Sequence, residues 1–192
     1  SGPAAQAANP EISSVSPAAA VVAGRFVMVQ EGKFSLNGKP YYFVGANFWQ
    51  GMNLGVDGPS GDRPRLLQEL DFLRQLGVTN LRIMASSEGP NTEPYRMVPA
   101  LMTSPGEYDG SVLDGLDFLL AEMGKRGMRA VMVLNNFWQW SGGMVQYVSW
   151  HEKTPIPYPG DYEKFIHYSA KFYSYEECQE WFCDHIAMLT SR

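Results

Sequence analysis

The sequence predicts an α/β protein in which parallel strands alternate with helices. A unit of strand, loop, helix, glycine and strand runs twice along the chain. The strand that ends the first unit begins at Gly77-Val78, and the strand that ends the second unit begins 50 residues later, at Gly127-Met128. The strands are short apolar runs, whereas the segments between them carry leucines at helical spacing. We therefore expect parallel strands joined by helices that cover both faces of the sheet.

The composition is compatible with one domain that has a hydrophobic core, or with part of a larger domain. The 192 residues are 45% hydrophobic and 13% aromatic, while only 18% are charged. The net charge of −5 argues against a nucleic-acid partner, which would require a basic face. Because the chain lacks an apolar run of 18 residues, we expect no membrane-spanning segment.

The first segment, residues 1–24, is rich in Ala, Ser and Pro and predicts a flexible leader. It has neither an initiator Met nor a basic n-region, so we expect a processed or engineered N-terminus from which any signal peptide has been removed. Near the other end, Cys178 and Cys183 would lie about 140° apart around a helix, too divergent for a relaxed disulfide. A local turn would permit a bridge, so their redox state stays open.

Folded structure is expected from Arg25 onward. Residues 26–29 and 33–36 predict a hairpin, which runs through an Asn37-Gly38 turn into a strand at residues 41–45. A helix then begins at Asp62 or Arg63, with Pro64 in its first turn, and ends at Gly77.

The second unit begins with a strand at residues 81–85 and a long polar loop at residues 86–110. Ser111 is the predicted N-cap of the next helix, with Asp114 completing a capping box, and residues 130–134 predict a strand buried on both faces. An aromatic, Pro-rich loop is expected at about residues 137–173. The last helix, residues 175–189, should direct four side chains inward: Trp181, Phe182, Ile186 and Leu189.

Function in parallel α/β folds gathers on loops that leave the carboxyl ends of strands. Here these loops are residues 47–61, 86–110 and 135–161. The tetrapeptide Asn-Phe-Trp-Gln occurs in two of them, at residues 47–50 and 136–139. The two copies follow alternate strands, and alternate strands supply each side-chain layer of a (β/α)8 barrel.

These loops combine indole rings with amides and carry few charges, a combination that suits a sugar ring. The C–H face of a sugar is apolar, while its hydroxyls require hydrogen bonds, and Trp and Tyr offer both kinds of contact. The alternative is that the aromatics only pack the loops. The residues concerned are Trp49, Trp138, Trp140, Tyr147, Trp150, Asn47, Asn135, Asn136, Gln50, Gln139 and Gln146.

Two charged residues are further candidates. Arg82 interrupts an apolar strand, and because a buried Arg is costly when unpaired, we expect an acidic partner for it. That partner could be purely structural. Glu88 leads the following loop and could reach a ligand, although an isolated carboxylate is more often solvated.

Several familiar motifs are excluded. Asn91-Thr92-Glu93-Pro94 is similar to the Asn-Glu-Pro of glycosidases, but an extra Thr intervenes and it lies within a loop. The three histidines lack metal-ligand spacing, so no metal site is expected. Gly-x-Gly-x-x-Gly, Walker and Gly-x-Ser-x-Gly motifs are absent, which leaves nucleotide binding and esterase activity without support.

Two runs resemble the β-1,4-mannanases of glycoside hydrolase family 5: NLRIMASSEGPNTEPYRMVPALM and LDGLDFLLAEMGKRGMRAVMVLNNFWQWSGGMVQYVSW. The resemblance extends over about residues 26–190. It implies a (β/α)8 TIM barrel, of which this chain supplies the N-terminal hairpin and about the first three βα units. Residues 25–192 would then be the N-terminal part of a single catalytic domain.

The resemblance also implies roles for individual residues. Arg82 would support a nucleophilic glutamate, and the tryptophans and amides would line the glycone side of the cleft. The expected substrate-binding residues are Asn47, Trp49, Arg82, Glu88, Asn136, Trp138, Trp140, Tyr147 and Trp150. Retaining hydrolysis requires two carboxyl groups about 5 Å apart. In the family these come from strands four and seven, and neither glutamate is present in this sequence.

The expected function is endo-acting, retaining hydrolysis of β-1,4-mannosidic linkages in mannan, galactomannan or glucomannan. No metal or organic cofactor is expected, and the protein is expected to be secreted or periplasmic. The 192-residue chain alone should be inactive, with the remaining barrel strands on a second polypeptide or outside this sequence. The alternatives are a β-1,4-glucanase on the same fold, a non-catalytic mannan-binding half-barrel, or a purely structural half-barrel.

Overall fold

The computed structural model describes residues 26–158 and 160–192. The leader predicted at residues 1–24 lies outside this part of the chain, as does Arg25. The chain divides into two compact units, Ser1–Phe43 and Val44–Arg192, each with its own sheet.

The first unit contains a three-stranded antiparallel sheet, β1 (Met28–Gln30), β2 (Lys33–Leu36) and β3 (Lys39–Pro40). Asn37 and Gly38 link β2 to β3 with φ values of 54° and 72°. A hairpin turn with two positive φ values favours Asn-Gly, so the turn predicted there is confirmed.

The second unit is built on a parallel sheet in the order β4 (Val44–Asn47), β5 (Val78–Met84) and β8 (Arg129–Val133). The parallel arrangement confirms the fold class predicted from the repeated strand and helix unit. The first strand begins three residues later than predicted, at Val44. The middle strand begins three residues earlier, at Val78.

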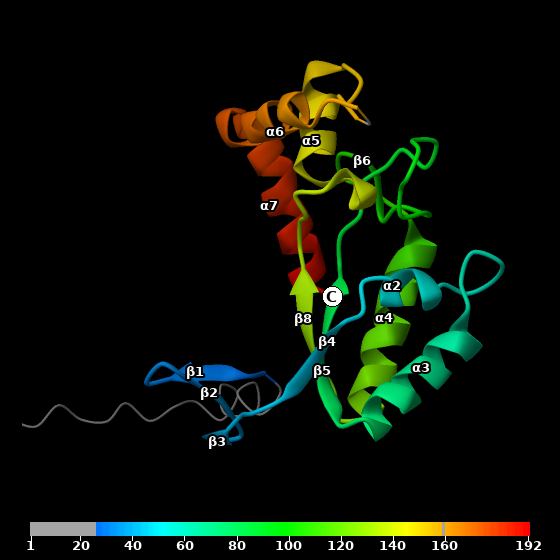
Figure 1. Ribbon diagram of the computed structural model, residues 1–192, viewed down its shortest axis with the longest axis vertical. Helices are drawn as coiled ribbons and strands as arrows, with labels where there is room; N and C mark the ends of the chain where they lie inside the picture. The colour runs from blue at the N-terminus through cyan, green and yellow to red at the C-terminus, as the bar shows by residue number, and fades with distance from the viewer. Residues whose placement is uncertain (1–25, 159) are drawn as a thin grey trace, which may run out of the picture. The chain divides into compact units, whose positions relative to one another are not determined.

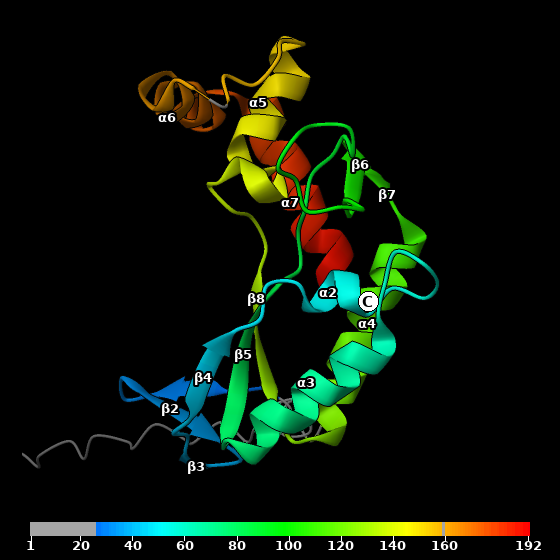
Figure 2. The same ribbon diagram turned by 45° about the vertical axis from the view of Figure 1, so that its right-hand side comes forward.

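Two helices lie together on one side of this sheet, α3 (Arg63–Gln75) and α4 (Gly110–Lys125), as Figures 1 and 2 show. Their leucines meet β5 in a common core, which includes Leu66, Leu70, Leu81, Leu116 and Leu119. Each such side chain contributes about 2 kcal/mol when removed from water. The core therefore holds the strand ends at fixed positions.

The other face of the sheet is less covered than expected. Val131 in β8 is 50% exposed, so the prediction that this strand is buried on both faces is wrong. α3 and α4 cover one face, whereas Val131 lies on the opposite face, paired with Arg82 in the strand register. An apolar run fits either a one-sided or a two-sided sheet, which is why the sequence misled here.

An aspartate carboxylate caps the N-terminus of both α3 and α4. Asp62 accepts a hydrogen bond from Arg65 N and caps α3, as expected. In α4 the N-cap is Asp109, not Ser111, because the Asp109 carboxylate accepts hydrogen bonds from the Ser111 and Val112 amides. Asp and Ser are comparable caps, and two candidates two residues apart allowed the error.

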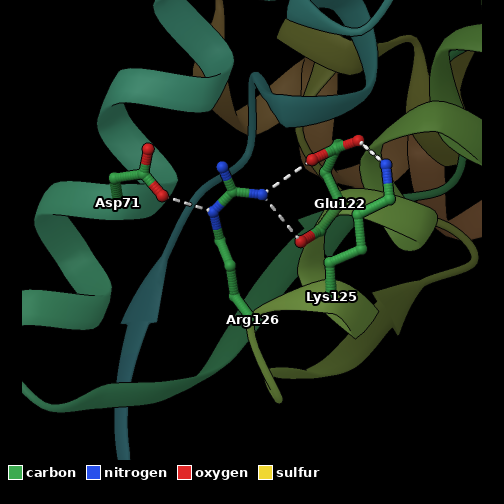
Figure 3. A network of polar contacts seen from close by, with 4 residues as sticks. All are labelled: Asp71, Glu122, Lys125 and Arg126. Atoms are coloured by element: carbon green, nitrogen blue, oxygen red, sulfur yellow. Dashed lines mark hydrogen bonds and ion pairs between the residues drawn. The ribbon is translucent and has the colours of Figure 1, made fainter.

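An ion-pair network ties α3 to the end of α4 (Figure 3). Arg126 Nε donates to Asp71 Oδ1 at 2.7 Å, and its Nη1 donates to Glu122 Oε2 at 2.7 Å. Lys125 donates to the second oxygen of Glu122. The hydrogen bond from Arg126 holds the pKa of Asp71 below its ordinary value.

The two segments predicted as loops contain regular structure. Residues 86–110 form the hairpin β6 (Met102–Ser104) and β7 (Glu107–Tyr108). Residues 137–173 form a 3-10 turn, η1 (Gln139–Ser141), followed by α5 (Gly143–Glu152) and α6 (Tyr162–Ala170). Aromatic residues obscured the helical period, but buried Phe165, Tyr168 and Phe172 recur at helical spacing.

The last helix, α7 (Glu176–Thr190), follows the turn η2 (Lys171–Ser174) and matches the predicted position. Of the four side chains expected to point inward, Leu189 is buried, and Trp181 and Phe182 are partly buried against a hydrophobic cluster. The fully buried line of the helix is Cys178, His185 and Leu189. Both Cys178 and Cys183 are free thiols. His185 Nε2 donates to Ala85 O at 3.1 Å, and burial lowers the pKa of His185. This contact joins α7 to the end of β5.

Candidate functional site

An aromatic hollow lies where β4 and β8 end. Trp49 and Trp140 meet edge to face, with ring centroids 5.4 Å apart. Together with Tyr95, Arg96 and Met97 they line a cavity of about 350 Å³. Trp49 comes from the first Asn-Phe-Trp-Gln string and Trp140 directly follows the second. The predicted convergence of these two loops is therefore observed in the geometry.

Backbone contacts fix both indoles. Phe48 N donates to Arg82 O at 2.8 Å, and the Phe48 side chain is buried, so the residue before Trp49 is anchored on β5. On the other side, Met97 N donates to Trp140 O at 2.6 Å. The Trp49 side chain itself stays 47% exposed and can receive a ligand.

Two predicted site residues, Asn47 and Arg82, lie next to each other on the exposed face of the sheet. Asn47 pairs with Arg82 and Arg82 pairs with Val131 in the strand register, so the three side chains share one face. Arg82 is exposed, and its side chain makes no ion pair within residues 26–158 and 160–192. Arg82 is therefore not buried within the described residues, contrary to expectation, because its face of the strand is open to water. Its acidic partner, expected to be a glutamate outside this chain, stays a prediction.

Glu88 is buried rather than presented to a ligand, with only 2% of its surface exposed. Its Oε2 accepts a hydrogen bond from Gly143 N at 2.7 Å, at the beginning of α5. Burial raises the pKa of Glu88 to about 7, although the Gly143 amide and the nearby Arg96 guanidinium lower it. Oε1 has no hydrogen-bond partner among the described residues. Glu88 is therefore bonded to the segment that follows Trp140 and helps to hold that segment in place.

Two glycines make this contact possible. Gly142 has a φ of 90°, and a Cβ there would lie 2.5 Å from the Cβ and O atoms of Glu88. Gly143 has a φ of 70°, and its Cβ would lie 2.4 Å from Asn136 O. Only glycine combines such backbone angles with so close an approach. The Ser-Gly-Gly string after Trp140 is thus required by the path of the chain.

Arg96 is a central residue that sequence reasoning missed. Its Nη1 donates to Glu88 O at 3.0 Å, and its Nη2 donates to Gln146 Oε1 at 2.7 Å. Burial lowers the pKa of Arg96, and its Nε has no partner among the described residues. A single Arg in an irregular loop has no periodic signal. Its position between Tyr95 and Met97, in an aromatic and apolar setting, was the only available clue.

The remaining predicted residues lie apart from the Trp49 and Trp140 pair. Asn136 Nδ2 donates to Ser141 Oγ at 3.0 Å and so braces the turn. Trp138 is 40% exposed and stacks on Tyr162 of α6, with centroids 5.8 Å apart. Trp138 is not among the residues that line the aromatic hollow.

Tyr147 and Trp150 pack in a second hydrophobic cluster, which also contains Phe165 and Phe172, rather than on the surface. Tyr147 is fully buried, and its ring meets Trp150 edge to face at 5.5 Å. The Tyr147 hydroxyl also lowers the pKa of Glu88, although this contact lies outside standard hydrogen-bond geometry. The substrate contacts expected of both residues stay a prediction.

Over the described ranges, no three His, Cys, Asp or Glu side chains are grouped to hold a metal ion. Among the helices of the same ranges, none combines the length and apolar character needed to cross a bilayer. The polar groups on the residues that line the aromatic hollow are two indole N–H groups, the Tyr95 hydroxyl and the Arg96 guanidinium.

Comparison with known proteins agrees with this geometry. The family described as "GH family 5 beta-mannosidase-like" matches residues 24–192. The chain is 32% identical to mannan endo-1,4-beta-mannosidase 3 of Solanum lycopersicum over 148 residues, which are 77% of this chain and 35% of that protein. It is 37% identical to mannan endo-1,4-beta-mannosidase 7 of Arabidopsis thaliana over 131 residues, covering 68% and 28% respectively.

Among solved structures, a glycoside hydrolase family 5 mannosidase from Rhizomucor miehei superposes with a TM-score of 0.83 at 46% identity. The match covers 88% of this chain and 43% of that one. An endo-1,4-beta-mannanase from the same organism has a TM-score of 0.63 at 22% identity and shares the fold. The chain thus spans about a third of the curated relatives that it matches and less than half of the similar structures.

Proposed function

Because the chain belongs to glycoside hydrolase family 5, in its beta-mannosidase-like group, we propose that the protein hydrolyses β-1,4-mannosidic linkages. The observation that supports this most directly is the hollow between Trp49 and Trp140, at the carboxyl ends of parallel strands in a partial (β/α)8 barrel. Indole faces next to a hydroxyl and a guanidinium donor are suited to a sugar ring. The plant relatives named above are endo-acting, which supports internal cleavage of a mannan chain.

The chemistry proposed is double displacement by two carboxyl groups about 5 Å apart. Glu88 is unsuited to either role, because it is buried and its Oε2 is committed to the Gly143 amide. We infer that both catalytic carboxylates come from polypeptide outside this chain, which spans only 35% of the first relative above. The chain itself would supply the aromatic floor.

The edges of the parallel sheet support the proposal of a second polypeptide partner. Within the described residues, β4 and β8 each pair only with β5, so each leaves one edge unpaired. Unpaired edges of this kind bind further strands readily. We propose that additional strands complete the sheet at these edges. Because a mannan polymer cannot cross a membrane, the protein would act after secretion, outside the cell or in the periplasm.

The test compares reducing-sugar release from galactomannan and from soluble cellulose, with intact mass and gel filtration on the same sample. The proposal predicts product from galactomannan for a sample that contains the remaining strands, and none for the 192-residue chain alone. Product mainly from cellulose would indicate a β-1,4-glucanase. Binding of mannooligosaccharides without product in the complete sample would indicate a carbohydrate-binding protein.

A further inference from the structure

The Glu88 side chain lies between two of the segments that line the aromatic hollow. Its own loop, residues 85–101, supplies one wall, and the segment after β8 supplies Trp140. Glu88 Oε2 accepts a hydrogen bond from Gly143 N at 2.7 Å, and Glu88 N donates to Ser141 O at 2.8 Å. The backbone and the side chain of Glu88 are thus both bonded to the residues that follow Trp140.

Arg96 forms a second link between the same two segments. Its Nη1 donates to Glu88 O at 3.0 Å, and its Nη2 donates to Gln146 Oε1 at 2.7 Å. Met97 N also donates to Trp140 O at 2.6 Å. Because Arg96, Met97 and Trp140 all line the hollow, its shape depends on how these two segments are held together.

The wall that carries Trp49 does not depend on these bonds. Trp49 is followed by α2 (Gly51–Leu54), which packs against α4. The two helices approach so closely that a Cβ on Gly55, just after α2, would lie 2.2 Å from Gly115 O. Trp49 therefore keeps its position when the segment after β8 moves, and such a movement would separate the two indoles.

The surroundings of Glu88 suit a neutral carboxyl group better than a carboxylate. Glu88 is buried, and its Oε1 has no hydrogen-bond partner among the described residues. The Tyr147 hydroxyl, which lies close enough to influence the charge of Glu88, has none there either. A buried carboxylate with an unpaired oxygen is costly, whereas the neutral acid costs much less. Burial accordingly raises the pKa of Glu88 to about 7.

Other ionisable groups pack around the Glu88 site. Arg96, on the same loop, stays a cation, because a guanidinium is not deprotonated in proteins. Burial raises the pKa of Tyr147 on α5 and of Tyr108 on β7 above the ordinary value of 10.0, so both stay neutral. His185 of α7 stacks on Tyr108 with ring centroids 5.8 Å apart, and burial lowers its pKa below 6.5. The ionisable groups next to these are Glu93 near Arg96, Asp184 near Tyr108 and Cys178 near Tyr147. Glu88 is thus the group of this cluster whose charge changes near pH 7.

The residues that cover the Glu88 carboxyl belong to one short segment. Gly142 lies so close that a Cβ there would be 2.5 Å from Glu88 Cβ, and Gly143 N is bonded to Oε2. Movement of this segment would admit water to the carboxyl without disturbing the core between the sheet and α4. Local opening of this kind costs less free energy than global unfolding. A negative charge on Glu88 therefore favours a state in which the segment after Trp140 has moved away.

We propose that Glu88 is a positioning residue for the aromatic hollow, which holds the segment after Trp140 in place while its carboxyl is neutral and releases it when ionised. This inference rests on the proposed function, since mannan is the ligand assigned to the hollow, and adds a pH response to it. With a pKa of about 7 in the closed state and 4.5 when hydrated, the equilibrium constant for release should rise about tenfold from pH 6 to pH 8.

Hydrogen exchange on the complete protein measures this release. Fragments that contain residues 141–146 would be compared at pH 6 and pH 8, after correction for the intrinsic exchange rate. Fragments of α4 are the internal reference, because this helix lies in the main core and exchanges when the domain unfolds.

In wild type the opening constant of residues 141–146 should rise about tenfold from pH 6 to pH 8, and it should exceed that of α4 at both values. Glu88→Gln keeps the acceptor for Gly143 N but does not titrate, so its opening constant should change less than about twofold. Glu107→Gln is the matched control, because Glu107 is exposed and its removal should leave the wild-type response unchanged.

Mannobiose titration at pH 6 tests the effect on the hollow. Glu88→Ala removes the acceptor and should weaken binding about tenfold, whereas Glu88→Gln should bind within about twofold of wild type. Rescue by glutamine would show that the hydrogen bond positions Trp140. Arg126→Ala is the control for a general loss of stability, because it breaks an ion-pair network away from the hollow and should bind as wild type does.

The inference is overturned if residues 141–146 open equally at pH 6 and pH 8, if they open only together with α4, or if Glu88→Ala binds mannobiose as wild type does. Mannobiose binding by wild type would then persist, and the proposed function would stand. If Glu88→Ala does not fold, the exchange of wild type and Glu88→Gln decides. If wild type binds no mannobiose, the proposed function fails, and the exchange result still decides whether Glu88 positions the segment.

Discussion

Replacing the buried Glu88 by glutamine should remove a loss of stability that we expect of the wild-type protein between pH 5 and pH 8. In the folded protein, burial raises the pKa of Glu88 from 4.5 to about 7. Between these values Glu88 is protonated in the folded state and ionised in the unfolded state. The folded state therefore binds more protons, and the free energy of unfolding falls as the pH rises.

The magnitude follows from the pKa difference. At about 1.4 kcal/mol per pH unit, the rise from 4.5 to about 7 destabilises the fold by about 3 kcal/mol above pH 7, relative to its stability below pH 4.5. Glu88→Gln keeps the shape and an oxygen that can accept the hydrogen bond from Gly143 N. Since glutamine does not titrate, this pH dependence should disappear, and the variant should be at least as stable as wild type at pH 8.

The assay is urea unfolding at pH 5, 6, 7 and 8, followed by tryptophan fluorescence. Glu107→Gln serves as the control, because Glu107 is an exposed carboxylate in a neighbouring hairpin and its removal should leave the pH dependence in place. The reasoning is refuted if Glu88→Gln and wild type lose the same stability between pH 5 and pH 8.

Three further predictions concern other contacts. Arg126→Ala should lower the free energy of unfolding in a urea titration by about 1–2 kcal/mol, because Arg126 links Asp71 to Glu122. The control Arg74→Ala, at an exposed helix position, should change it by less than about 0.5 kcal/mol. Gly142→Ala should lower the free energy of unfolding by more than about 2 kcal/mol in differential scanning calorimetry, since its Cβ would meet Glu88. Gly124→Ala has open space around it in α4 and should leave the stability unchanged or raise it by about 0.5 kcal/mol. Equal effects of the two substitutions would contradict the close-approach argument. Trp49→Ala should weaken mannobiose binding about tenfold, or about 1.4 kcal/mol, without a comparable loss in the free energy of unfolding. Unchanged mannobiose binding would show that Trp49 is not part of the site.

The sequence was most informative where a rule of geometry applied. The periodic leucines placed α3 and α4, and the rule that function gathers at the carboxyl ends of parallel strands brought Trp49 and Trp140 into one site. Such rules depend on local pattern and topology, which the sequence carries directly.

Other features depend on tertiary surroundings that no local pattern encodes. Arg82 was expected to be buried because its strand is apolar, but its exposure depends on which elements cover that face. Glu88 was judged as a loop carboxylate, yet Gly142 and Gly143 allow a turn to fold over it. Arg96 carried no signal at all, since its role arises from contacts with residues up to 50 positions away.

The edge-to-face arrangement of Trp49 and Trp140 also gives the protein an optical property. Two indoles with centroids 5.4 Å apart and planes inclined by 68° couple their electronic transitions, which produces a paired positive and negative band in the ultraviolet circular dichroism spectrum. A ring that enters the hollow and alters this angle would change the band pair. Occupancy of the aromatic hollow could thus be followed in solution without any label, using chromophores that the chain already contains.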